Sequence, residues 1–191
     1  MAQPDTLVVD PPIARYDAVQ RALHWSMAAI ILVAVALGFW SSFLVPGTPL
    51  RKFLLEIHNS LGMTALMLVA IRIVYRLMVP APSYREPLAR LVDLGSKAAH
   101  LALYLLMVGM PLTGYLFSGA GGYSLPWFGL FHWPRLVPLD KPMAQFGQAL
   151  HGWGAIAIYI VLALHLTAVV WHQFVKKDDV LARMLPANSR R

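Results

Sequence analysis

The sequence has no cysteine and few charged residues. Only 13% of its 191 residues are charged, whereas a soluble domain of this size carries about 25%. Without cysteine the chain forms no disulfide, holds no thiolate-ligated metal cluster and attaches no cofactor through a thioether bond. Apolar residues make up 58% of the sequence instead. This composition predicts a membrane protein with little room for a soluble domain.

Four apolar stretches each approach the roughly 20 residues that a helix needs to cross a bilayer. They are long and do not alternate in polarity, which favours helices over the strands of a barrel. The first is too long for the core of a signal peptide, so we expect a retained helix. Asp17 and Gln20 predict a capping box at its start, and Pro111 predicts a kink in the third helix. The predicted helices cover residues 17–44, 50–78, 88–117 and 143–175.

The basic residues divide unevenly between the two ends of these helices. Cytoplasmic loops are enriched in Lys and Arg, so the end with twelve basic residues is expected to be cytoplasmic, together with both termini. The net charge of +7 then reflects membrane topology and not binding to nucleic acid. The twelve are Arg15, Arg21, Arg72, Arg76, Arg85, Arg90, Lys97, Lys176, Lys177, Arg183, Arg190 and Arg191, and the outer four are Arg51, Lys52, Arg135 and Lys141.

Flexible tails are expected at both ends of one transmembrane domain, which spans residues 15–186. The first tail, residues 1–14, contains three prolines, and the second is residues 187–191. The connection 118–142 is rich in aromatic residues. Tryptophan and phenylalanine favour the membrane interface, so this connection is expected to cover whatever lies beneath the outer surface.

Four histidines in the apolar stretches carry the functional hypothesis. Ionisable residues inside a bilayer are costly and are therefore functional candidates. His151 and His165 are fourteen residues apart in one stretch, which on a helix is about 1400° of rotation and about 21 Å of rise. Both side chains therefore share one helix face, one near each side of the membrane.

Depth in the membrane predicts how the histidines pair. His58 and His151 lie at a similar depth near the outer ends of their helices, and His24 and His165 lie near the inner ends. Two neutral imidazoles are the axial ligands of a low-spin haem b suited to electron transfer. We therefore expect an all-α bundle of four transmembrane helices that encloses two b haems. The competing interpretations are polar bundle residues, a proton path or a transition-metal transporter.

Small and basic residues near these histidines fit the same hypothesis. Gly62 follows His58 by four residues, Gly152 and Gly154 follow His151, and Gly38 lies fourteen residues after His24 on the same helix face. A porphyrin needs such gaps, although glycine also serves helix contacts in membranes. Arg72 and Arg76 are candidates to pair with haem propionates, or to extend toward the interface as topology anchors.

Three further histidines have other expected roles. His172 lies seven residues after His165, on nearly the same face, so it either competes with His165 as a ligand or lines a quinone pocket. His100 is expected to contact the bundle or a propionate. His132, in the outer connection, is expected to be structural or interfacial.

The chain resembles the bacterial cytochrome b561 family of small four-helix di-haem proteins of the inner membrane. The matching motifs are Arg21-Ala-Leu-His24-Trp25, Ile57-His58 with Gly62, His100-Leu-Ala-Leu-Tyr104-Leu-Leu with Pro111 and Gly114, the three histidines His151, His165 and His172, and the run from Lys177 to Pro186. The resemblance covers residues 15–186. It implies inner ligands His24 and His165 and outer ligands His58 and His151, in agreement with the depth argument.

One branch of that family oxidises periplasmic superoxide and reduces ubiquinone, and the resemblance makes this the leading expected activity. It also implies that His172 contributes to a quinone site. Arg51, Lys52, Arg135 and Lys141 are candidates to steer the superoxide anion, or they are ordinary solvated surface charges. The alternative function is an electron-transfer subunit that links a periplasmic dehydrogenase or cytochrome to the quinone pool.

Overall fold

The computed structural model describes residues 13–84 and 87–186. The expected tail at 187–191, most of the expected tail at 1–14, and Arg85 lie outside the described residues. All the helices and strands below belong to the described ranges.

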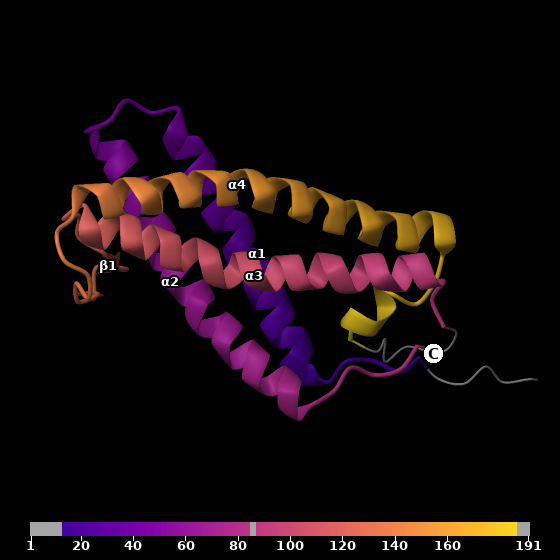
Figure 1. Ribbon diagram of the computed structural model, residues 1–191. Coiled ribbons are helices and arrows are strands. Elements are labelled where there is room, and N and C mark those ends of the chain that lie inside the picture. The colour runs from indigo at the N-terminus through magenta and orange to yellow at the C-terminus, as the bar shows by residue number, and fades with distance from the viewer. Residues whose placement is uncertain (1–12, 85–86, 187–191) are drawn as a thin grey trace, which may run out of the picture.

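Four long helices make up the fold (Figure 1), and each is long and apolar enough to cross a membrane. This confirms the predicted four-helix architecture. The helix ends differ from the predicted bounds by three residues or fewer when the π-helical extension of α4 is counted, and α3 continues through Pro111 as one helix. The helices are α1 (Ala18–Ser42), α2 (Pro49–Met78), α3 (Arg90–Ala120) and α4 (Lys141–Val170), which a π-helix, Trp171–Lys176, extends.

Local sequence explains where the helices begin. The Asp17 carboxylate accepts a hydrogen bond from the Gln20 backbone N–H at 2.8 Å, and Asp140 accepts one from Met143 N at 2.7 Å. Each satisfies a backbone donor that a first helical turn leaves free. The predicted capping box is wrong in its second half, because Gln20 does not return a bond to Asp17. Its buried side chain donates instead to Val79 O at 2.8 Å, which satisfies a carbonyl at the end of α2.

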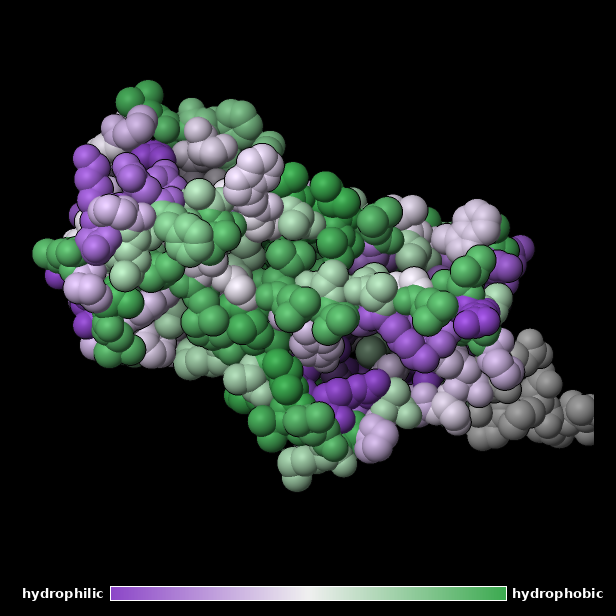
Figure 2. All heavy atoms as spheres, viewed as in Figure 1, coloured by the Kyte–Doolittle hydropathy of each residue, from purple (hydrophilic) through white to green (hydrophobic). Residues whose placement is uncertain are grey.

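The helices pack as two pairs, α1 with α2 and α3 with α4, and α2 also contacts α3. In Figure 1 α3 and α4 run side by side, and α1 and α2 cross them obliquely. Few residues are fully buried, among them Val69, Ser60 and Met27. Large apolar side chains point outward along every helix, as lipid contact requires. Figure 2 shows this apolar surface over the middle of the molecule, with hydrophilic residues gathered toward its ends.

A short antiparallel hairpin between α3 and α4 folds against α2. Its strands are β1 (Pro126–Trp127) and β2 (Phe131–His132). Ser60 Oγ donates to Pro126 O at 3.1 Å and accepts from Phe128 N at 2.9 Å. The Trp127 indole N–H donates to Thr64 Oγ1 at 3.1 Å. The hairpin is therefore fixed to α2 on the helical turns just beyond His58.

Arg183 fixes the C-terminal segment to the opposite end of the bundle. It lies in a 3₁₀ turn, Ala182–Met184, and is only 3% exposed. Its guanidinium stacks over Tyr84 at 3.8 Å from the ring centroid and donates to Pro82 O and Ala14 O. The Tyr16 backbone N–H in turn donates to Arg183 O at 3.0 Å. One arginine thus joins three separate stretches of the chain.

Candidate functional site

The rings of His58 and His151 meet between α2 and α4. Their centroids are 6.0 Å apart and their planes are nearly perpendicular, at 84°. His58 Nδ1 lies 2.8 Å from Ala34 O, and His151 Nδ1 lies 3.0 Å from Met110 O. A carbonyl only accepts hydrogen bonds, so each Nδ1 carries the proton. Each Nε2 then keeps its lone pair for a metal, which is the arrangement of histidine ligands in metalloproteins.

Two glycines make room for these rings. A Cβ atom at Gly38 would lie 3.0 Å from Cε1 of His58, and one at Gly114 would lie 3.3 Å from Cε1 of His151. Both distances are closer than ordinary van der Waals contact, so a side chain there would displace the ring. At Gly62, the glycine singled out from the sequence, a Cβ would meet nothing within 4 Å. That position borders open space, as the edge of a haem pocket would.

The inner histidines form a second cluster. The His100 and His165 rings lie 5.6 Å apart at 83°, and His24 lies near the start of α1 at the same end of the bundle. The proximity of His100 to His165 was not expected from the sequence. His100 Nδ1 donates to Ser96 O at 2.6 Å, whereas His24 Nδ1 lies 3.4 Å from the Arg72 guanidinium.

Arg72 and Arg76 both border a cavity of about 340 Å³ beside this cluster. Arg72 Nε donates to the Tyr104 hydroxyl at 3.0 Å. Arg76 lies over the Tyr16 ring, and its Nη1 is buried without a hydrogen-bond partner among the described residues. A buried guanidinium nitrogen of this kind needs an acceptor. The cavity is therefore built to receive an anionic group, and its wall also includes His100.

Comparison with known proteins identifies the family. The family model for prokaryotic cytochrome b561 matches residues 15–187. The chain belongs to that family. Relatives of similar length include cytochrome b561 homolog 2 of Escherichia coli strain K12, which is 34% identical over 92% of this chain and 93% of its own length. The probable superoxide oxidase CybB of Yersinia pestis is 30% identical over 90% of this chain and 96% of its own length. Cytochrome b561 homolog 1 of E. coli K12 is 23% identical over 90% of this chain and 97% of its own length.

As a member of this family, the chain is a multi-pass membrane protein of electron transfer, and the family implies haem b as its cofactor. The residues present fit that cofactor. His58 and His151 offer two facing imidazoles with free Nε2 atoms, glycines clear the space around their rings, and Arg76 offers an unpaired donor for a carboxylate.

The contact that the structure shows for the His172 ring is with Asp178 and not with either histidine cluster. Its Nδ1 is 2.6 Å from Asp178 Oδ2, and the His172 side chain is only 14% exposed. No sequence pattern predicted this contact, because the chain has to reverse over the five intervening residues before the two side chains can meet.

The four basic residues that the sequence predicts at the outer end of the bundle fall into two groups. Arg51 and Lys52 lie in the first turn of α2, where Arg51 Nε donates to Ser41 O at 3.2 Å and Lys52 lies 4.0 Å from Glu56. Arg135 follows the hairpin, and Lys141 begins α4. All four are at the same end of the bundle as His58 and His151, and His132 is exposed on β2 beside them.

Proposed function

We propose that this cytochrome b561 carries electrons across a bacterial inner membrane through two haems b, from superoxide outside to ubiquinone. The single observation that carries the proposal is the facing pair His58 and His151, each with Nδ1 bound to a backbone carbonyl. Haem b, when bound, supplies a one-electron carrier. Each superoxide gives up one electron and leaves as O₂. Two such electrons and two protons convert ubiquinone to ubiquinol.

The inner haem is assigned to His24 and His165, as the outer one is to His58 and His151. His58 and His151 belong to different packed pairs of helices, and so do His24 and His165. A flat cofactor enters more readily between the pairs than within one of them. His100 and His165 lie on α3 and α4, which pack against each other as one pair. We therefore assign His100 to the wall of the pocket.

Arg72 and Arg76 are assigned to the propionates of the inner haem. The unpaired Nη1 of Arg76 supports this, because arginine binds carboxylates through paired, charge-assisted hydrogen bonds. Ligation by His24 requires Arg72 to release Nδ1 of that ring, and a propionate is the group that would attract its guanidinium. Gly62 is assigned to the edge of the outer haem. His172 is assigned to the quinone site.

Superoxide is the proposed donor on two grounds. One relative, at 30% identity, is named a probable superoxide oxidase. The outer end of the chain also carries Arg51, Lys52, Arg135 and Lys141, and a cationic field raises the on-rate of an anion. Oxidising superoxide to O₂ requires no proton at this end. The twelve to four distribution of basic residues supports cytoplasmic termini, so the quinone end faces the side from which protons are taken.

The alternative function is an electron-transfer subunit for a periplasmic dehydrogenase or cytochrome. This alternative is kept because the relative at 34% identity is named as a cytochrome, without a substrate. The small size of the chain suits docking to a larger partner as well as independent action.

The deciding experiment is stopped-flow spectroscopy on the purified holoprotein. Haem content is measured first and should be two haems b per chain. Superoxide should then reduce the haems on mixing, and superoxide dismutase should abolish that reduction. A short-chain ubiquinone should reoxidise the reduced haems. Two haems that ignore superoxide but are reoxidised by quinone would favour the subunit function. A protein that binds no haem would overturn both.

A further inference from the structure

The helix that carries His172 ends in an unusual way. The extension of α4, Trp171–Lys176, is π-helical and ends the helix. Lys177 follows with a left-handed backbone, φ +53°, which is uncommon for a residue with a side chain. This turn reverses the chain and brings Asp178 back against His172.

The contact between the His172 and Asp178 side chains is short, and further hydrogen bonds fix both residues. His172 Nδ1 and Asp178 Oδ2 are 2.6 Å apart. The other carboxylate oxygen, Oδ1, accepts from Val180 N at 3.2 Å, and the backbone N–H groups of Lys177 and Asp178 both point to His172 O. The carboxylate therefore has a fixed direction, and so does the ring that it contacts.

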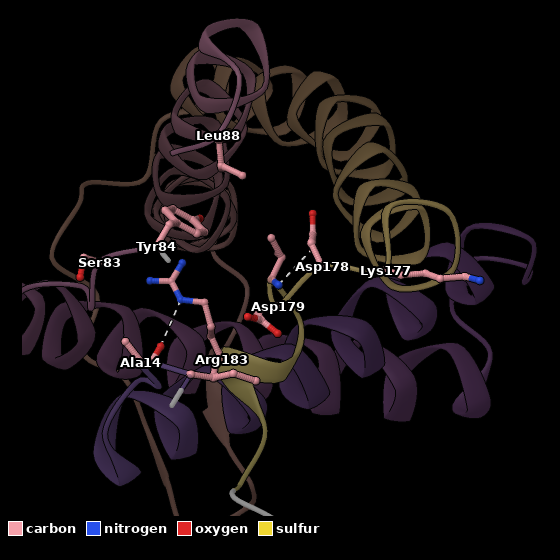
Figure 3. Close-up of a pocket in the computed structure, with 10 residues that line it drawn as sticks. Ala14, Ser83, Tyr84, Leu88, Lys177, Asp178, Asp179 and Arg183 are labelled. Carbon is pink, nitrogen blue, oxygen red and sulfur yellow. Dashed lines mark hydrogen bonds between the residues drawn. The ribbon is translucent and has the colours of Figure 1, made fainter. Parts of the chain in front are cut away.

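Asp178 also borders a cavity of about 360 Å³ at the end of the bundle that is proposed to be cytoplasmic. Figure 3 shows the Asp178 side chain directed toward the space between Leu88, Tyr84 and Lys177. The Asp178 side chain is 33% exposed and that of His172 is 14% exposed. The aspartate is thus the member of the pair that solvent reaches more easily. The charged or titratable groups around this pair are Tyr84, Lys176, Lys177, Asp179 and Arg183.

We propose that Asp178 positions His172 as the proton donor to the quinone. This inference rests on the proposed quinone reduction. The Asp178 carboxylate holds the ring with Nδ1–H directed toward it and stabilises the imidazolium, which leaves Nε2–H as the proton that is given away. Two electrons reach the quinone one after the other from the inner haem, one quinone oxygen takes a proton from Nε2 of His172, and the other takes a proton from cytoplasmic water. The ring then regains its proton from cytoplasmic water.

Asp178→Asn is the informative variant, because the single amide oxygen of asparagine can still accept from His172 Nδ1. The charge is lost while the contact with His172 is kept, and the bond that Val180 N donates to the other oxygen is lost with it. The holoprotein is reduced with dithionite, freed of excess reductant and mixed with a water-soluble ubiquinone over a range of pH. We expect haem reoxidation to slow by about tenfold or more. The pH above which the rate falls should move to a lower value, because the carboxylate charge beside His172 is gone.

Three controls separate this role from a structural one. Haem content and reduction by superoxide should equal those of the unmodified protein. Added formate should restore part of the reoxidation rate in Asp178→Asn by entering the cavity as a substitute carboxylate. Arg90→Gln removes an exposed charge at the start of α3, and it should change nothing.

The possible failures are distinguishable. An Asp178→Asn protein with the unmodified rate and pH profile overturns the role of Asp178 and leaves quinone reduction intact. A loss of rate that formate does not restore and that has an unchanged pH profile also overturns it, since the defect is then structural. If ubiquinone fails to reoxidise even the unmodified protein, the proposed function itself is wrong.

Discussion

His151 Nδ1 and the carbonyl of Met110 lie 3.0 Å apart across the interface of α3 and α4. This bond determines which nitrogen of His151 faces His58, and the bond from His58 to Ala34 does the same on the other side. Each candidate ligand on the outer side is thus oriented by the backbone of a neighbouring helix. The Thr113 hydroxyl also lies 3.2 Å from His151 Nδ1, so a side chain of α3 supports the backbone contact on that side.

Removing either outer histidine should remove one haem. His58→Ala and His151→Ala are each expected to lower the haem content from two per chain to one and to leave the inner haem spectrally intact. The reason is that one imidazole cannot hold a low-spin bis-histidine centre. Pyridine haemochrome analysis and reduced-minus-oxidised spectra measure this. His132→Ala, on the exposed hairpin, is the control and should retain both haems. A His151→Ala protein with two normal haems contradicts the assignment.

Comparing His24→Ala with His100→Ala tests the inner ligand. We expect His24→Ala to lose the inner haem and His100→Ala to retain it, because His24 lies across the gap between the helix pairs from His165. The same spectra report the result, together with the electron paramagnetic resonance signal of the remaining low-spin centre. The reverse outcome, with haem lost only in His100→Ala, would reassign the ligand to the ring that lies 5.6 Å from His165.

The helices and the depth of each histidine could be predicted because they depend on local sequence. Apolar length defines a membrane span, and the 3.6-residue period places His151 and His165 on one face. Contacts between distant segments could not be predicted in this way. The bond from Gln20 to Val79 joins residues 59 positions apart, and no local pattern favours it over a return bond to Asp17.

The rest of the candidate site depends on how the helices pair. Sequence alone does not say that α3 packs on α4 and α1 on α2, so it could not bring His100 beside His165. The contact between His172 and Asp178 depends on a left-handed Lys177, a conformation that lysine rarely adopts. The role of Gly38 was suspected from its spacing to His24, yet the ring that it accommodates belongs to His58.

Gly38→Ala should weaken the outer haem site specifically. The new methyl group would lie 3.0 Å from Cε1 of His58, so the ring must move or the helices must separate, at a cost of about 1–3 kcal/mol. We expect faster loss of the outer haem to apomyoglobin, with the inner haem unaffected. Gly109→Ala, where a Cβ meets nothing within 4 Å, is the matched control. Equal haem loss from both variants would show that ring displacement is not the cause.

Arg76→Gln should lower the midpoint potential of the inner haem. A nearby cation stabilises the reduced haem, which is the more negative form, so removing it favours oxidation. An interaction of about 1 kcal/mol corresponds to about 40 mV for one electron. Redox titration of the two haems measures this shift, and the outer haem should keep its potential. Arg90→Gln removes an exposed charge at the start of α3 and is the control. An unchanged inner potential would favour the topology-anchor role for Arg76.

Neutralising outer lysines should slow the encounter with superoxide. Lys52 is 79% exposed in its side chain, and Lys141 is exposed at the start of α4, so neither contributes much to packing. The double variant Lys52→Gln, Lys141→Gln is expected to lower the second-order rate of haem reduction by superoxide several-fold at low ionic strength. The deficit should shrink as salt is added, because screening removes the same attraction from the unmodified protein. Arg90→Gln, at the opposite end, should keep the unmodified rate and salt dependence. A rate that is unchanged in the double variant and independent of salt would reduce these lysines to ordinary surface charges.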